Sequence, residues 1–117
     1  MFRFEELEIW KLAIEYANEI YDLSEKLPGE ERYNVVDQLR RAALSISNNI
    51  AEGSATSTTK NFCLFLDRSI GSALETVNLL HFSRKRNYIS EVQQSELYNK
   101  AEIIIKKIRS FKNSLKS

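Results

Sequence analysis

Apolar side chains recur at steps of three and four along four consecutive segments of this chain, a spacing that places them on one face of an α-helix. The 117 residues include only three Gly and one Pro, so few positions favour turns. Hydrophobic residues make up 43% of the chain, which is enough for a packed core. Because this length suits one domain, we expect a single all-α domain built from a few long helices.

Breaks in the helical pattern give the approximate helix ends. Pro28 and Gly29 end the first segment, since Pro lacks an amide donor and Gly tolerates a left-handed cap. Gly53 begins the second break, a Ser or Thr at 57–59 can cap the third helix, and Ser90 can cap the fourth. Short connections make sequential helices antiparallel. We therefore expect an antiparallel up-and-down four-helix bundle, with helices over about residues 5–26, 31–54, 60–87 and 91–115.

The second helix has an unusual composition. Its stretch RRAALSISNNIAEGSA, residues 40–55, has helical spacing but mostly short side chains. Ser and Asn are poor helix formers, so helix propensity alone does not explain them. The stretch is either a tightly packed internal helix with a modest exposed strip, or it carries a polar stripe at a subunit contact or a lined cavity. We favour the second interpretation for a set of candidate interface residues: Gln38, Arg40, Arg41, Ser45, Asn48, Asn49, Glu52, Gly53, Gly71 and Glu75.

The last two of these residues belong to a similar row on the third helix. Gly71 interrupts that helix with no Pro nearby, which indicates a close contact or a functional role. Glu75 could pair with Arg40 or Arg41, and Arg68 could pair with Glu52. Exposed pairs of this kind would contribute little to stability, whereas shielded ones would be costly to break.

Charge is distributed unevenly along the chain, although its formal net value is only +1. Residues 1–57 contain six Lys or Arg against eleven Asp or Glu, and residues 58–117 contain eleven against five. This asymmetry indicates a basic face, self-association through opposite ends, or merely drift in the charge of solvated faces. Tyr88 beside the basic cluster could stack on a base. The candidate nucleic-acid-binding residues are Arg84, Lys85, Arg86, Lys106, Lys107 and Arg109.

The residues that usually carry catalysis are sparse. His81 and Cys63 are the only histidine and cysteine, too few ligands for a structural zinc site within one chain. A carboxylate site formed by Glu52 and Glu75 is conceivable but lacks the Glu-x-x-His pattern of di-iron bundles. We therefore expect no enzyme activity, metal or cofactor. The single cysteine fits a cytoplasmic protein, and no apolar run is long enough to span a membrane.

The segment QLRRAALSISNNIAEG, from Gln38 to Gly53, resembles the signature of a bacterial four-helix-bundle family, the 23S rRNA intervening-sequence proteins. Further similar pieces are found in the opening segment, the first loop, the third helix and the turn before the last helix. Ser69-Ile70 departs from the family pattern, which often has Ala and a polar or basic residue there. The similar pieces are Phe4-x-x-Leu7-x-x-Trp10, Pro28-x-x-Glu31-x-Tyr33, Phe62 to Leu66, Gly71-Ser72-x-x-Glu75 and Tyr88-Ile89.

This resemblance implies an up-and-down bundle that assembles into a homopentameric ring. It also implies a link to reading frames inside rRNA intervening sequences. A related bundle is the accessory protein of diversity-generating retroelements, where a basic pentamer contacts a reverse transcriptase and nucleic acid. We therefore expect a non-enzymatic homo-oligomer that binds RNA, DNA or a nucleoprotein through its basic C-terminal half. The alternative is a protein-interaction scaffold or adaptor without a nucleic-acid ligand.

Overall fold

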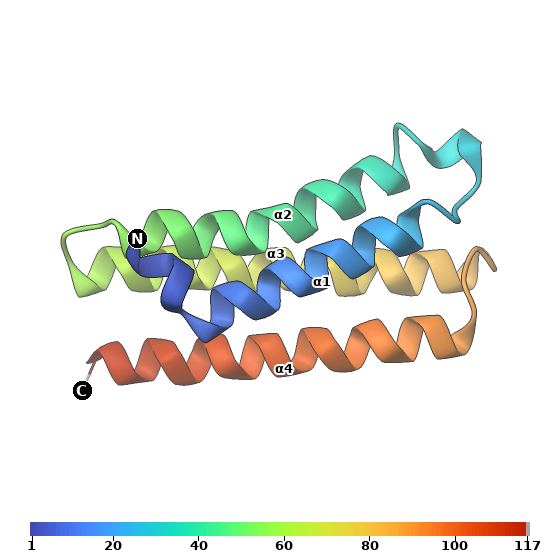
Figure 1. Cartoon of the computed structure of the whole chain (residues 1–117). Helices are drawn as coiled ribbons and strands as arrows, with labels where there is room; N and C mark the ends of the chain where they lie inside the picture. Colours follow the sequence, from blue (N-terminus) through green and yellow to red (C-terminus); the bar gives the residue numbers. More distant parts are fainter. Residues whose placement is uncertain (117) are drawn as a thin grey trace.

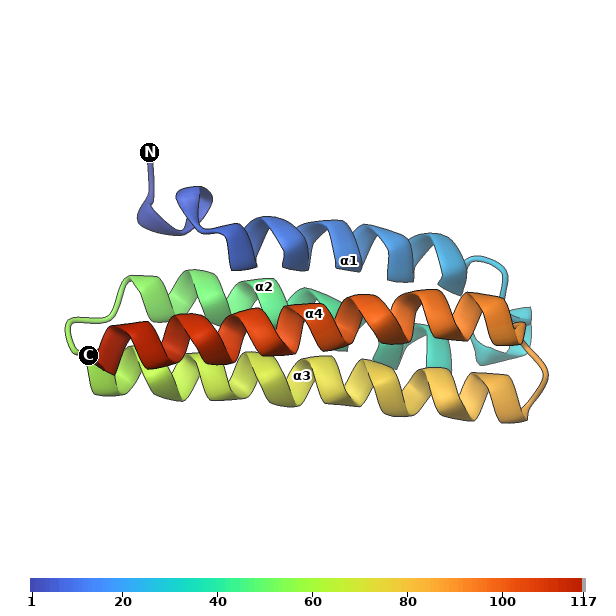
Figure 2. The same cartoon turned by 90° about the horizontal axis from the view of Figure 1, so that it is seen from below.

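The computed structural model describes residues 1–116, which form four α-helices, each antiparallel to its neighbour in sequence (Figure 1). The bundle measures 44 × 23 × 21 Å. The N-terminus and the end of the last helix lie at the same end of the bundle (Figure 2). The expected antiparallel up-and-down four-helix bundle is confirmed. The elements are η1 (Arg3–Glu6), α1 (Glu8–Ser24), η2 (Gly29–Glu31), α2 (Val35–Ser54), α3 (Thr59–Lys85) and α4 (Glu91–Lys116), where η marks a short 3-10 helix.

The hydroxyl caps that the sequence predicts are present. The Thr58 side chain accepts a hydrogen bond from the Asn61 amide at 3.1 Å and so caps α3. Ser90 and Gln93 form a reciprocal capping box at the start of α4, because each side chain accepts a bond from the other residue's backbone amide. These bonds satisfy amides that have no partner within their own helix.

Two helices begin later than the apolar spacing predicts. The expected helix 5–26 becomes η1 followed by α1, since the backbone at Leu7 is extended. The expected helix 31–54 begins at Val35, because residues 29–31 form η2 instead. At the end of α3, Asn87 adopts a left-handed conformation with φ 62°, and the Tyr88 amide donates to the Ser83 carbonyl at 2.9 Å. This backbone geometry is a Schellman motif, and it ends α3 at Lys85.

The core of the bundle is apolar, with a few hydroxyl groups that are each hydrogen bonded. The Tyr16 side chain is 1% exposed, and its hydroxyl lies 2.8 Å from the Thr76 hydroxyl. Burial raises the pKa of Tyr16 to about 12, because a charged phenolate would lose its hydration there. None of the helices in the described part of the chain combines the length and hydropathy that a membrane-spanning helix requires.

Helices α2 and α3 pack closely through small residues. The Ser69 hydroxyl donates to the Ile46 carbonyl at 2.7 Å, so a side chain of α3 reaches the backbone of α2. Near the end of α2, a Cβ atom built on Gly53 would lie 2.7 Å from the Cβ of Phe65 and 2.9 Å from a ring carbon of Phe62. The absence of a side chain at Gly53 therefore allows this approach of the two helices.

We expect Gly53→Ala to lower the free energy of unfolding by about 1–3 kcal/mol, because the added methyl group would force α2 and α3 apart. Urea denaturation followed by circular dichroism measures this change. Gly29→Ala is the matched control, since no heavy atom lies within 4 Å of its added Cβ. Equal stabilities of the two variants would show that the contact at Gly53 is not restrictive.

Candidate functional site

One long side of the bundle presents the short polar side chains of α2 next to a similar row on α3. Asn48, Glu52 and Gly71 are exposed, while Ser45 and Ser72 are half-buried where the two helices meet. We call this surface the α2–α3 face. It consists of Gln38, Arg41, Ser45, Asn48, Asn49 and Glu52 on α2 and of Arg68, Gly71, Ser72 and Glu75 on α3.

Hydrogen bonds connect the inner edge of the α2–α3 face. The Ser72 hydroxyl donates to the Ser45 hydroxyl at 2.8 Å. The Asn49 amide donates to the carbonyl and the hydroxyl of Ser45 at 2.8 and 3.0 Å. Short side chains here therefore hold α2 and α3 in register.

The outer edge of the same face makes few contacts within one chain. No hydrogen bond involves the Asn48 side chain within residues 1–116, and no heavy atom lies within 4 Å of a Cβ built on Gly71. Of the two explanations that the sequence offers for Gly71, a close contact within one chain is therefore not made. The amide of Asn48 and the open space at Gly71 remain accessible to a partner.

Arg40 contributes to the structure of the monomer and does not belong to the α2–α3 face. Its Nε donates to the Ser24 hydroxyl at 2.8 Å, and its guanidinium lies 4.7 Å from the centre of the Tyr21 ring. Both contacts connect α2 to α1. Arg41 points into solvent with 80% of its side chain exposed and pairs with Asp37 at 3.0 Å on the same helix.

The cross-helix ion pairs suggested for this face are wrong within the described chain. Glu75 pairs with neither Arg40 nor Arg41, and Arg68 packs over the Phe65 ring at 4.9 Å and does not pair with Glu52. Arg41 and Arg68 instead contact a carboxylate or a ring on their own helix, partners that require no reach across a groove.

The carboxylate site considered for Glu52 and Glu75 does not form within one chain. The contact between Ser45 and Ser72 fixes the register of two antiparallel helices. Glu52 lies seven residues after Ser45 and Glu75 lies three residues after Ser72, so the two carboxylates are separated by about 15 Å along the bundle. Across residues 1–116, no group of three or more His, Cys, Asp and Glu side chains could hold a metal ion.

The six candidate nucleic-acid-binding residues fall into two separate groups. Arg84, Lys85 and Arg86 lie at the end of α3, whereas Lys106, Lys107 and Arg109 lie on α4. α4 begins beside the end of α3 (Figure 1) and reaches Lys106 fifteen residues later, so the groups are about 22 Å apart along the bundle. They therefore do not form one patch on a single chain.

Nearby acidic side chains partly offset the positive charge of both groups. The pKa of Arg86 is raised by its contact with Tyr88 and, to a smaller extent, by the carboxylates of Glu31 and Glu30. Lys107 pairs with Glu8 of α1 at 2.9 Å. The exposed cations without an ion pair in the described chain include Lys85, Lys106 and Arg109.

Lysines of α4 pair with acidic residues of neighbouring helices, an arrangement that we did not predict from the sequence. Lys100 pairs with Glu19 and Lys107 with Glu8, both on α1. Lys112 pairs with Asp67 of α3 at 2.7 Å. The signal was present as the acidic first half and basic second half of the sequence, which we interpreted as a property of the outer surface.

We expect Arg40→Lys to lower the free energy of unfolding by about 1–2 kcal/mol, because lysine cannot both bond to Ser24 and stack flat on Tyr21. Arg41→Lys is the matched control and should stay within about 0.5 kcal/mol of the parent protein. Chemical denaturation of both variants measures the difference. If the free energy of unfolding of Arg40→Lys equals that of the parent protein, the contact between α1 and α2 does not depend on the guanidinium.

Comparisons with known proteins agree with this arrangement. A family model described as 23S rRNA-intervening sequence protein matches residues 5–110. The chain is also similar to the crystal structure of a protein of unknown function from the S23 ribosomal protein family of Bacteroides thetaiotaomicron VPI-5482. That similarity has a TM-score of 0.81 and 25% sequence identity, over 88% of this chain and 96% of that one. None of the curated proteins matches the chain. Because the family model covers most of the sequence, the chain belongs to the 23S rRNA-intervening sequence protein family.

Proposed function

We propose that this chain is a non-enzymatic subunit of a ring-like homopentamer. The ring binds RNA, DNA or a nucleoprotein, and it does so in the cytoplasm. The observation that carries the proposal is the outer edge of the α2–α3 face, where Asn48 and Gly71 are exposed and make few contacts within one chain. The exposed cations of α3 and α4 would then be repeated on every subunit. The pentameric number rests on the family resemblance.

The α2–α3 face suits contact with another protein surface. Short side chains lose little conformational freedom when they are covered, and they let a neighbouring backbone approach closely. The unpartnered amide of Asn48 and the open space at Gly71 add a hydrogen-bonding group and a depression. Long exposed Lys or Glu side chains, which would hinder such an approach, are largely missing between Arg41 and Glu52.

The nucleic-acid part of the proposal depends on repetition. Each chain offers Lys85, Lys106 and Arg109 as exposed cations without an ion pair in the described chain. A few cations on one small domain bind a phosphate backbone weakly, but linking several copies raises the effective concentration of each binding site. An oligomer would therefore bind far more tightly than one chain.

A protein-interaction scaffold is the second candidate, and the ion pairs of α4 favour it. Lys100, Lys107 and Lys112 are each paired within the chain, and the formal net charge is only +1. A near-neutral protein lacks the strong positive field of dedicated nucleic-acid binders. In this case the assembled ring would hold another protein.

We expect Gly71→Leu and Asn48→Leu to reduce the mass of the assembly in multi-angle light scattering, because each adds bulk to the α2–α3 face. In a single chain a Cβ at Gly71 meets no heavy atom within 4 Å, and leucine replaces a poor helix former, so the monomer should be as stable as the parent or more stable by up to about 1 kcal/mol. A fall in mass without unfolding would therefore locate the effect at a subunit contact.

Asn99→Leu is the matched control for the assembly experiment. Asn99 is exposed on α4, away from the α2–α3 face, so the same substitution should leave the mass unchanged. A parent protein that remains a single-chain species at high concentration would rule out the proposed assembly. Equal masses for all three variants would show instead that the α2–α3 face is not the subunit contact.

We expect binding to structured RNA or DNA to fall steeply as salt rises from 50 to 200 mM, because phosphate contacts release counterions. Combined Lys106→Ala and Arg109→Ala should weaken this binding several-fold, and the Arg84→Ala, Lys85→Ala, Arg86→Ala triple variant should do the same if both groups contact nucleic acid. Fluorescence anisotropy with labelled hairpins of RNA and DNA measures the affinities.

Asn99→Ala is the control for this binding experiment, since it removes no charge and lies outside the α2–α3 face. Binding that is undetectable at low salt, while light scattering still shows the oligomer, would reject the nucleic-acid proposal and favour the scaffold. A stable protein partner that co-purifies with the oligomer, without nucleic acid, would support the scaffold directly.

A further inference from the structure

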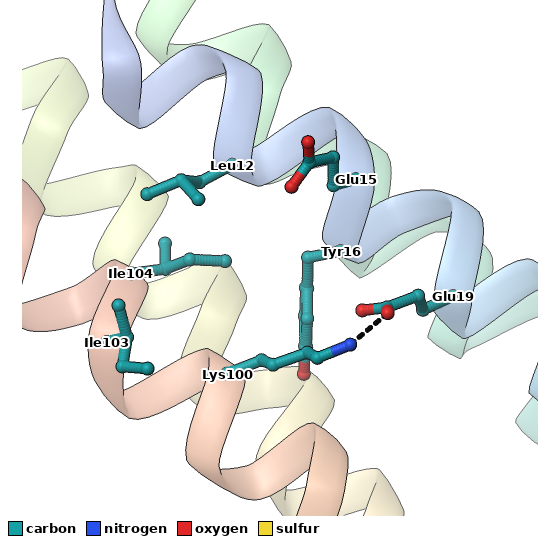
Figure 3. Close-up of a pocket in the computed structure, with 7 residues that line it drawn as sticks. All are labelled: Leu12, Glu15, Tyr16, Glu19, Lys100, Ile103 and Ile104. Carbon is teal, nitrogen blue, oxygen red and sulfur yellow. Dashed lines mark hydrogen bonds and ion pairs between the residues drawn. The ribbon is translucent and has the colours of Figure 1, made fainter.

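The seam between α1 and α4 contains a pocket of about 140 Å³ (Figure 3). Leu12 and Tyr16 of α1 and Ile104 of α4 form its apolar wall, and Ile103 lies at the opening with 49% of its surface exposed. An engineered protein cavity of about 150 Å³ with an aliphatic lining is known to hold benzene. The pocket therefore has room for one compact apolar group.

Three charged side chains line the same pocket. Glu15 and Glu19 come from successive turns of α1, and Lys100 comes from α4 (Figure 3). Lys100 and Glu19 form an ion pair, so their charges offset each other. Glu15 has no ion pair within residues 1–116, which leaves one carboxylate unneutralised beside the apolar wall.

We propose that this pocket binds a small organic cation, a primary ammonium group carried on a compact apolar body. The body lies among Leu12, Tyr16 and Ile104, and the ammonium lies beside the carboxylate of Glu15. This site is independent of the proposed assembly and of nucleic-acid binding, because it uses neither the α2–α3 face nor the cations named above for nucleic acid.

The charges at the opening select among ligands of one shape. An ammonium gains an attraction to Glu15, whereas a carboxylate of the same size would be repelled by Glu15 and could be accepted only by breaking the pair of Lys100 and Glu19. A neutral alcohol gains the apolar contact alone. Affinity should therefore fall in the order ammonium, alcohol, carboxylate, and the preference for ammonium should shrink as salt rises.

Titration of the parent protein with cyclohexylmethylammonium, cyclohexylmethanol and cyclohexanecarboxylate, followed by methyl NMR, tests this order. We expect saturable shifts at Leu12, Ile103 and Ile104 with a dissociation constant in about the millimolar range for the ammonium, which is typical of a ligand with few atoms. Weaker binding of the alcohol and no saturation with the carboxylate are the expected results.

Two variants locate the site, and a third is the control. Glu15→Gln keeps the shape of the side chain but removes its charge, so it should weaken ammonium binding about three- to five-fold and leave alcohol binding unchanged. Ile103→Trp, at an exposed position, should cover the opening and abolish binding of both. Glu102→Gln, exposed on α4 and outside the pocket, should change neither.

Several outcomes would overturn the proposal. Equal binding of the three probes, or an ammonium affinity that is the same in Glu15→Gln and Glu102→Gln, would remove the role of the carboxylate. Shifts that map to other residues would place the ligand elsewhere. Methyl signals of Leu12 and Ile104 that ignore the probe but depend on protein concentration would show that a second copy covers the pocket.

Discussion

The close packing of α2 against α3 is the contact on which the rest of the bundle depends. It combines a hydroxyl-to-backbone bond from Ser69 to Ile46 with the missing side chain at Gly53, which lets the Phe62 and Phe65 side chains approach the backbone of α2. A longer residue at either place would push the helices apart. The register set here determines which side chains of the two helices share a face.

This contact explains only part of the short-side-chain stretch in α2. Ser45, Asn49 and Gly53 contact α3 or support residues that do, so their small size serves the monomer. Asn48 and the opposing Gly71 are different, because packing inside one chain does not require them to be small. The size restriction at these two positions therefore calls for an explanation outside the monomer, which is the reason for placing a subunit contact there.

The helices, their order and the hydroxyl caps at Thr58 and Ser90 could be predicted from the sequence, because spacing and capping depend on neighbouring residues. The partners of charged side chains could not. Arg40 binds Ser24 and Tyr21, and it does not bind Glu75, because the choice depends on which helix lies within a few ångströms. The late starts of α1 and α2 depend in the same way on how η1 and the connection between α1 and α2 fold, which apolar spacing does not report.

Part of the uneven charge of the sequence is used in ion pairs between helices of the same chain. Acidic α1 lies beside α4, and its carboxylates pair with Lys100 and Lys107. Each exposed pair contributes little to stability, but together they remove cations from any surface that a polyanion could contact. The candidate cations that remain on α3 and α4 lie in two small groups about 22 Å apart along the bundle, too few in either place for one chain to hold a phosphate backbone tightly. The proposed nucleic-acid binding therefore depends on the proposed assembly, because repetition of the remaining cations on every subunit would bring more of them together on one positive surface.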